Sequence, residues 1–379
     1  MNMSDDLLDR VQRRLLDNPI DDPAALARLI RDEAGVISDL ELLDVLRRLR
    51  DNVTGAGPLE RLLLLDGLTD VIVNSPQEVW IDRGHGLELT EVRFAEDDDV
   101  RRLATRLASA CGRRLDDAQP FVDGRIRRDD GTLVRLHAVL SPPARSHTLL
   151  SLRVLRQATT RLEDLVRSAS VPAEIAELLQ SMIAARLSFL VVGGTGTGKT
   201  TLLSALLAEV PAHERIICIE DTAELDPVHP HVVGLTTRAH NTEGTGAISM
   251  SDLLVQALRM RPDRLVVGEI RGREVVDLLA ALNTGHDGGA GTLHANTAAE
   301  IPARMEALAA LGGLDRAALH SQLAAAVDIA LVMRRRQDGT RELAQIAVLE
   351  GNPVQVRTLW RSGEPASARL REQLTGKEW

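Results

Sequence analysis

The residues of this chain with the clearest chemical potential lie in one glycine-rich stretch followed by a lysine and two threonines. Its spacing, Gly-x-x-x-x-Gly-Lys-Thr, is the Walker A pattern, in which backbone N–H groups surround a phosphate chain. Lys199 is expected to reach the β- and γ-phosphates, and the Thr200 hydroxyl to ligate Mg²⁺. The stretch predicts a nucleoside triphosphate site formed by Gly193, Gly194, Thr195, Gly196, Thr197, Gly198, Lys199, Thr200 and Thr201.

Lysine usage supports a chemical role for Lys199. The chain has 45 Lys and Arg residues, but only two of them, Lys199 and Lys377, are lysines. A compact ammonium on a flexible stem suits a tight phosphate loop, whereas a planar guanidinium does not. The guanine-reading motif Asn-Lys-x-Asp also needs a lysine, and neither lysine stands in one. The sequence therefore favours ATP, with Mg²⁺, as the ligand.

Acidic residues stand at the ends of two predicted apolar strands and are candidates for metal and water chemistry. Residues 265–269 form an apolar run that ends in Glu269, a Walker B pattern whose acid can hold the Mg²⁺ shell or deprotonate the attacking water. Glu220 and Asp221 end the preceding predicted strand, and ligands collect at the carboxyl ends of such strands. A capping role for Asp221 stays open, and Arg271 can pair with Glu269 or with phosphate. Thr200, Glu220 and Glu269 are the predicted metal ligands, partly through water.

Histidines and upstream arginines are further candidates with two readings each. His286 and His294 can sense the γ-phosphate by hydrogen bonding or satisfy a buried backbone group. Arg125, Arg135 and Arg153 lie on predicted strands, where each by itself is an ordinary surface arginine.

The elements around these residues predict several modules. Residues 1–54 read as a helical module for partner docking or packing, 55–156 as an α+β domain with an antiparallel sheet, and 157–175 as a polar linker. Residues 176–379 alternate strands and helices, which predicts a RecA-like domain with a largely parallel, helix-covered sheet. The tail from residue 357 is polar and is expected to be loose. Strands are expected at 70–74, 78–82, 87–94, 121–126, 132–140, 148–155, 187–192, 215–221, 264–269, 291–294, 328–333 and 345–349, and helices at 98–111, 172–185, 202–210 and 251–260.

Composition limits the classes of partner. The net charge is −10, aromatic residues make up 2% and tyrosine is absent, so direct nucleic-acid binding is not expected. Two cysteines without a paired metal-binding spacing fit a reducing cytosol. An acidic start and the lack of a membrane-length apolar run predict a cytoplasmic protein. Contact with the membrane is then expected only through a partner.

The motifs together resemble the type II/type IV secretion ATPase superfamily, in particular its Tad/Flp pilus and conjugal-transfer branch. The resemblance covers about residues 55 to 350. It rests on several sequence motifs that follow one another in the order typical of the family. These are residues 193–200, the acidic box at 219–225, Leu258–Asp263, Val267–Gly272 and the histidine box at 283–296, with upstream matches at 57–60, 69–74, 119–125 and 130–135.

The resemblance implies a RecA-like P-loop motor preceded by an α+β (PAS-like) domain and a short helical segment. It further implies a homo-hexamer with ATP between the two domains, so that Arg125, Arg135 and less directly Arg153 reach the phosphates. It favours a role at the nucleotide site for His294, and less strongly for His286. The four-cysteine zinc insert of the type II branch is absent. The expected function is an ATPase that powers Tad/Flp-type pilus assembly or secretion with an inner-membrane platform protein; the alternatives are a conjugation-type ATPase and a nucleotide-gated scaffold.

Overall fold

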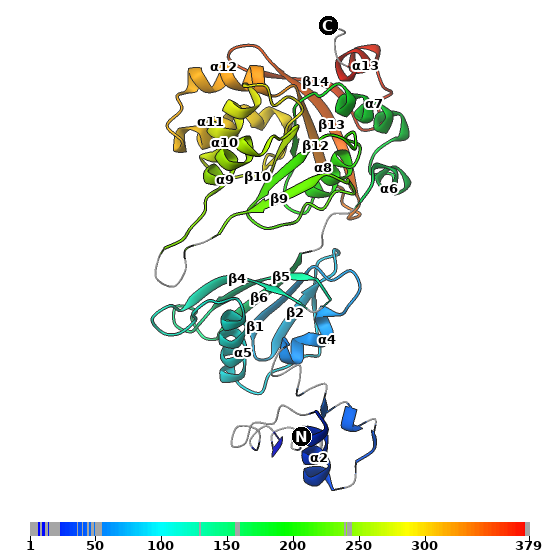
Figure 1. Ribbon diagram of the computed structural model, residues 1–379. Coiled ribbons are helices and arrows are strands. Elements are labelled where there is room, and N and C mark those ends of the chain that lie inside the picture. The colour runs from blue at the N-terminus through cyan, green and yellow to red at the C-terminus, as the bar shows by residue number, and fades with distance from the viewer. Residues whose placement is uncertain are drawn as a thin grey trace. The chain divides into compact units, whose positions relative to one another are not determined.

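The chain divides into two compact units, Met1–Leu155 and Arg156–Trp379. Figure 1 follows them along the colour gradient, the N-terminal unit in blue and cyan and the C-terminal unit from green to red. Each unit has its own buried apolar clusters. The computed structural model describes residues 7, 10–11, 14, 23–35, 37–39, 41–43, 45–46, 49, 55–128, 130–155, 160–238, 240 and 245–375.

The first part of the N-terminal unit is helical. Helix α2, Pro23–Ala34, agrees with the helical character expected for residues 1–54. Its Ile30 is fully buried in an apolar cluster with Leu7, Val11, Leu42, Val45 and Leu49. The other expected helices fall partly outside the described residues. The described side chains therefore form a small apolar core of their own.

The remainder of this unit is a six-stranded sheet in the order β3-β2-β1-β6-β5-β4, with every neighbouring pair antiparallel. Buried and exposed side chains alternate along β4, β5 and β6, so one face packs on helix α5 and the other is exposed. This confirms the predicted antiparallel α+β fold. The bounds are η1 Gly57–Leu59, α4 Glu60–Leu63, β1 Asp70–Ser75, β2 Glu78–Asp82, β3 Leu87–Leu89, α5 Asp97–Ala110, β4 Phe121–Arg127, β5 Leu133–Val139 and β6 Leu149–Leu155.

One strand of the N-terminal unit is shorter than predicted. The strand expected over 87–94 ends at Leu89. Val92 and Phe94 turn into the core instead, and the Phe94 backbone N–H donates to the Pro76 carbonyl at 2.8 Å. Burial of these two apolar side chains explains why the chain leaves the sheet edge.

The C-terminal unit is built on an eight-stranded sheet in the order β14-β13-β12-β7-β11-β10-β8-β9. The pairs from β12 through β9 are parallel, while β13 and β14 add antiparallel edge strands. The strand bounds are β7 Phe189–Val192, β8 Ile216–Glu220, β9 Val232–Thr236, β10 Arg264–Ile270, β11 Ala290–Leu293, β12 Ile329–Arg335, β13 Arg341–Glu350 and β14 Gln355–Arg361. The expected largely parallel sheet is present, and it is mixed at one edge.

Helices cover both faces of this sheet, and each face has its own apolar cluster. One face carries α6, α7, α8 and α13, and the other carries α9 to α12 (Figure 1). In the part of the chain that the structure describes, no helix combines the length and the apolarity needed to cross a membrane. The helix bounds are α6 Leu162–Arg167, α7 Ala173–Ala184, α8 Lys199–Leu207, α9 Met250–Ala257, η2 Leu258–Met260, α10 Glu274–Leu282, η3 Ala298–Glu300, α11 Ile301–Leu311, α12 Arg316–Ala326 and α13 Ala368–Leu374.

A predicted linker and a tail expected to be loose are both packed parts of the C-terminal unit. The predicted linker 157–175 contains α6, whose Leu162 and Leu165 are buried in the core. The tail from residue 357 continues β14 and then α13, and Leu370 and Leu374 are fully buried. Only a few apolar residues in each segment pack against the core. The polar composition of the segments therefore did not indicate this packing.

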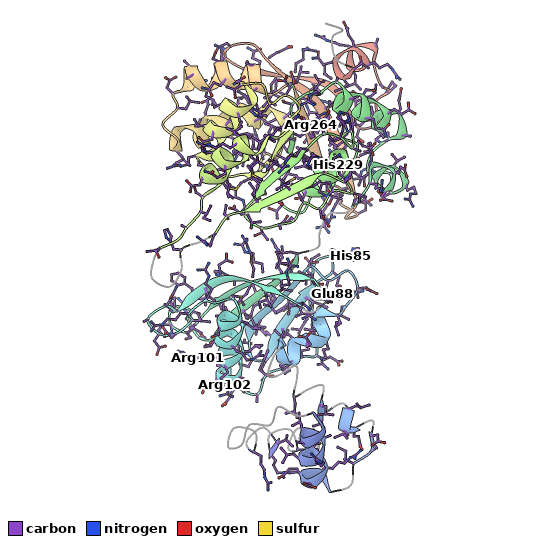
Figure 2. All side chains as sticks on the ribbon, in the orientation of Figure 1. His85, Glu88, Arg101, Arg102, His229 and Arg264 are labelled. Carbon is purple, nitrogen blue, oxygen red and sulfur yellow. The ribbon has the colours of Figure 1, made fainter. Side chains whose placement is uncertain are left out.

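A buried ion pair ties the start of the parallel strands together. Figure 2 labels Arg264, which lies among the strands of the C-terminal unit. Its side chain is fully buried, and Nε donates to Oε2 of Glu214 at 2.6 Å. Nη2 donates to the Ile183 carbonyl at 2.8 Å. Burial lowers the pKa of Arg264, while the Glu214 carboxylate acts in the opposite direction and stabilises the charged form.

Candidate active site

The glycine-rich loop joins β7 to α8, as its sequence predicts. Strand β7 ends at Val192 and α8 begins at Lys199, preceded by Gly198 in the left-handed region with φ of 94°. A Cβ atom at Gly193 would lie 2.5 Å from the Met333 carbonyl oxygen, so only glycine fits there. The backbone can therefore approach its neighbours closely and turn into the helix.

Lys199 lies beneath this loop with its ammonium held by main-chain oxygens. The side chain is 8% exposed, and Nζ donates to the Gly193 and Gly194 carbonyls at 3.0 and 2.9 Å. Burial lowers the pKa of Lys199, and the carboxylate of Glu269 opposes that shift. The Lys199 ammonium therefore places a positive charge at the phosphate-binding loop.

Glu269 and His294 come to the loop because their strands are neighbours in the sheet. Strand β11 pairs with β7 so that Leu293 lies opposite Val192, and β10 pairs with β11 so that Ile270 lies opposite Leu293. Since all three strands are parallel, their carboxyl ends meet at one edge. Oε1 of Glu269 lies 3.0 Å from Nε2 of His294. The structure brings the predicted acid and one predicted histidine together.

Charged and polar side chains lie next to both carboxylate oxygens of Glu269. Arg271 donates to Oε2 of Glu269, and this contact raises the pKa of Arg271. Oε1 is buried and accepts no hydrogen bond of acceptable geometry from the described residues. Burial and the Lys199 charge lower the pKa of His294 below its ordinary value, which favours the neutral form of its ring. An imidazole and a carboxylate in this arrangement can together orient a water molecule.

Arg271 itself is fixed by the start of α10. Oε1 of Glu274, which is 7% exposed, accepts hydrogen bonds from the backbone N–H groups of Arg271 and Gly272, both at 2.7 Å. Arg271 Nη1 also lies 4.0 Å from Oδ2 of Asp221. The arginine therefore bridges the ends of β10 and β8.

Glu220 and Asp221 lie at the same sheet edge but differ in their surroundings. Oε1 of Glu220 accepts backbone hydrogen bonds from Glu224 and Leu225 at 3.1 and 3.0 Å. Oδ1 of Asp221 accepts from the Thr237 hydroxyl at 3.1 Å. A cavity of about 420 Å³ opens beside Asp221 and Arg271. Glu220 thus has a structural contact as well as its predicted chemical role.

The donor set fits Mg²⁺ bound with nucleotide phosphates. Mg²⁺ keeps several waters and takes one or two carboxylates plus phosphate oxygens, so it needs no all-protein cage. The described residues hold no cluster of three or more His, Cys, Asp or Glu suited to a metal. The hydroxyl of Thr200 at the start of α8 and the buried Oε1 of Glu269 are hard oxygen donors of the required kind.

His286 is not brought to this edge. It precedes β11, and its Nδ1 lies 3.2 Å from the Ala281 carbonyl at the end of α10. The adjoining Gly288 N–H donates to Ser188 Oγ, just before β7 begins. Within this unit His286 therefore lies at the amino ends of the parallel strands, away from the loop, and its expected role at the nucleotide stays a prediction.

The predicted arginines form one row on the exposed face of the N-terminal sheet. Arg125 lies opposite Arg135, and Arg135 opposite Arg153, across β4, β5 and β6. Nε and Nη2 of Arg135 donate to Asp123 at 2.9 and 3.0 Å, and Nε of Arg153 donates to Asp70 at 2.8 Å. Like charges directly opposite one another are destabilising, and these acids offset that cost. The role of this row at a phosphate stays a prediction.

Three residues near the site carried no functional prediction. A Cβ atom at Gly268 would lie 2.6 Å from Cγ of Glu220, so this glycine makes room for the acid. A glycine inside a strand indicates such a close approach, and that signal was available. Met333 and Arg341 pack against the loop from β12 and β13. The sequence holds no local signal for them.

Comparisons with known proteins give consistent results. A family model described as Type II/IV secretion system protein matches residues 52–357. The chain is 58% identical over 330 residues to a Mycobacterium tuberculosis protein described as a candidate conjugal transfer protein, which covers 86% of this chain and 94% of that protein. It is 29% identical over 317 residues to the conjugal transfer protein TrbB of Rhizobium radiobacter, covering 81% and 91%.

A solved structure shares the fold. The ATPase DotB of Legionella pneumophila matches with a TM-score of 0.56 and 19% identity, covering 78% of this chain and 81% of that one. At this level of identity the match supports the fold alone.

Proposed function

This chain belongs to the Type II/IV secretion system protein family and is an ATPase, and on that basis we propose that it powers conjugation-type type IV secretion. The relatives above that carry a functional description are conjugal transfer proteins. Those names favour the conjugation-type alternative over the Tad/Flp pilus function that the sequence favoured. The observation that carries the ATPase chemistry is the meeting of Lys199, Glu269 and His294 at one sheet edge.

In the proposed reaction each group has a separate task. Lys199 and the loop N–H groups bind the phosphate chain, and Thr200 holds Mg²⁺, which would neutralise charge on the β- and γ-phosphates. Glu269 accepts the proton of the attacking water. His294 orients that water or the γ-phosphate as a neutral donor. Glu220 and Asp221 tune the water shell of the metal.

The wider arrangement is also a proposal. We infer a homo-hexamer in which Arg125 and Arg135 of the N-terminal unit close over the phosphates, with Arg153 beside them. A cation placed there would stabilise charge on the transferring phosphoryl group. The row of arginines in register supports this role. We place the protein at the cytoplasmic face of the cell membrane, docked on an inner-membrane platform protein and making no direct contact with nucleic acid.

A transfer assay in the host tests the proposed function. Replacing the gene with a Lys199→Ala version should reduce DNA or effector transfer at least as far as deleting the gene does. Arg369→Gln, on the exposed side of α13, is the matched control and should transfer normally. Normal transfer by Lys199→Ala would overturn the proposal. Normal transfer with lost pili would reassign the protein to pilus assembly.

A nucleotide-gated scaffold without sustained turnover is the alternative class. The buried Lys199 and the pairing of the Glu269 carboxylate with His294 argue against it, because a scaffold needs no water-activating acid. Steady-state release of phosphate separates the two: an ATPase gives a linear rate over many turnovers, and a scaffold stops after one.

A further inference from the structure

We propose that Arg341 forms the base-binding end of the nucleotide site, with its guanidinium lying flat on the adenine ring. This inference deepens the proposed function and rests on it. Arg341 begins β13, and its side chain lies near Gly198 of the phosphate-binding loop. A Cβ atom at Gly198 would lie 3.2 Å from Cδ of Arg341 and 3.6 Å from Cε of Met333. Both side chains therefore border the loop directly.

The other arginines of the β12–β13 hairpin are engaged, and Arg341 is not. Arg334 and Arg336 both form ion pairs with Glu342, which is 3% exposed. Nε of Arg335 donates to the Gly339 carbonyl at 3.3 Å. With the part of the chain that the structure describes, the exposed Arg341 guanidinium forms no hydrogen bond or ion pair. Its charged plane is thus available to a ligand held by the loop.

The order of the strands fixes which end of a nucleotide Arg341 would meet. Glu269 and His294 follow β10 and β11, which lie on one side of β7. The reacting γ-phosphate must point toward that side, because the water-activating acid is there. Strands β12 and β13 lie on the other side of β7. A nucleotide whose phosphates pass through the loop therefore directs its sugar and base toward Arg341.

The described part of the C-terminal unit offers no exposed Phe, Tyr or Trp that could stack on a base. Its residues of these types are Phe189 and Trp360, and both are 1% exposed, so neither can reach a ligand at the surface. A guanidinium also stacks well on aromatic faces. Arg341, whose side chain is exposed, can therefore supply the platform that aromatic residues supply elsewhere.

Equilibrium binding with two probes tests the inference. The full chain is titrated with Mg·ADP and with Mg·tripolyphosphate, which has the phosphates but no base. Arg341→Lys keeps the charge and removes the plane, and it should raise the Kd for ADP roughly three- to thirtyfold, as expected for a lost cation–π contact. Its Kd for tripolyphosphate should stay within about twofold of wild type, because the loop is unchanged. Arg335→Lys is the matched control and should change neither value.

Two results would overturn the inference. Wild-type ADP binding by Arg341→Lys would show that the plane contributes nothing. Equal weakening toward ADP and tripolyphosphate would place the side chain on phosphate rather than on the base. If the wild-type protein bound neither probe, the proposed ATPase function would fail as well. Tripolyphosphate binding by the variant also reports that its loop is folded.

Discussion

Gly268 is the residue whose substitution most sharply tests the packing behind the acidic edge. It lies in β10 directly before Glu269, and a Cβ atom there would lie 2.6 Å from Cγ and 3.0 Å from Oε1 of Glu220. Glu220 is 5% exposed, and that same Oε1 accepts the backbone hydrogen bonds of Glu224 and Leu225. Gly268→Ala must therefore push the buried carboxylate away from its two donors.

The expected cost follows from these contacts. Overpacking costs about 1–3 kcal/mol, and loss of hydrogen bonding to a charged group costs about 1.5–3 kcal/mol more. Alanine in a strand interior recovers about 0.5–1 kcal/mol relative to glycine. The net loss of unfolding free energy is about 1.5–5.5 kcal/mol, which for a unit of this size lowers Tm by roughly 3–22 °C.

Thermal unfolding of the purified chain measures this change. Gly234→Ala, in β9, is the matched control, because a Cβ atom there meets nothing within 4 Å. Its Tm should stay the same or rise slightly. ATP turnover by Gly268→Ala should also fall, because Glu220 leaves the metal edge. An unchanged Tm for Gly268→Ala, or an equal drop in both variants, would refute the reasoning.

Two further predictions concern ion pairs. Arg336 and Arg334 lower the pKa of Glu342 to about 2 from 4.5. Both arginines are more than half exposed, so Glu342→Gln should cost only about 1–3 kcal/mol of stability at pH 7. That contribution is present above pH 4.5 and is lost as the pH falls toward 2, so urea unfolding of the two proteins should converge there; a constant difference would contradict the assignment. Glu214→Ala removes the ionic partner of the buried Arg264 and should lower the free energy of unfolding by about 3–5 kcal/mol. Glu350→Ala removes a half-exposed partner of Arg357 and should lower it by less than about 1 kcal/mol. Equal losses in denaturant unfolding would show that burial does not set the cost.

The parts of the site that are local in sequence could be predicted. The loop, Lys199 and the acids at strand ends follow from spacing, because a parallel sheet brings its carboxyl ends to one edge. The antiparallel sheet of the N-terminal unit was likewise predicted, because its strands are short and separated by turns. The strand register could not be predicted from the spacing of residues. In the structure it places Arg125, Arg135 and Arg153 in one row.

The parts that depend on distant pairing could not be predicted. Edge strand β14 and helix α13 are held by a few buried residues within a polar tail, and strand β9 was missed. Arg341 lies next to Gly198 because the β12–β13 hairpin brings these two residues, which are far apart in the chain, close together. The motif of His286 lies near β11 in sequence but precedes that strand. Proximity along the chain did not indicate which edge of the sheet His286 occupies.

Steady-state phosphate release by Glu269→Gln tests the central claim most directly. Gln keeps the size of the side chain and removes the base, so turnover should fall about 10²- to 10⁴-fold below that of the wild-type protein. The Kd for Mg·ADP should change little, because Lys199 and the loop remain. Wild-type turnover by Glu269→Gln, with nucleotide binding intact, would contradict the assignment of Glu269 as the group that activates water.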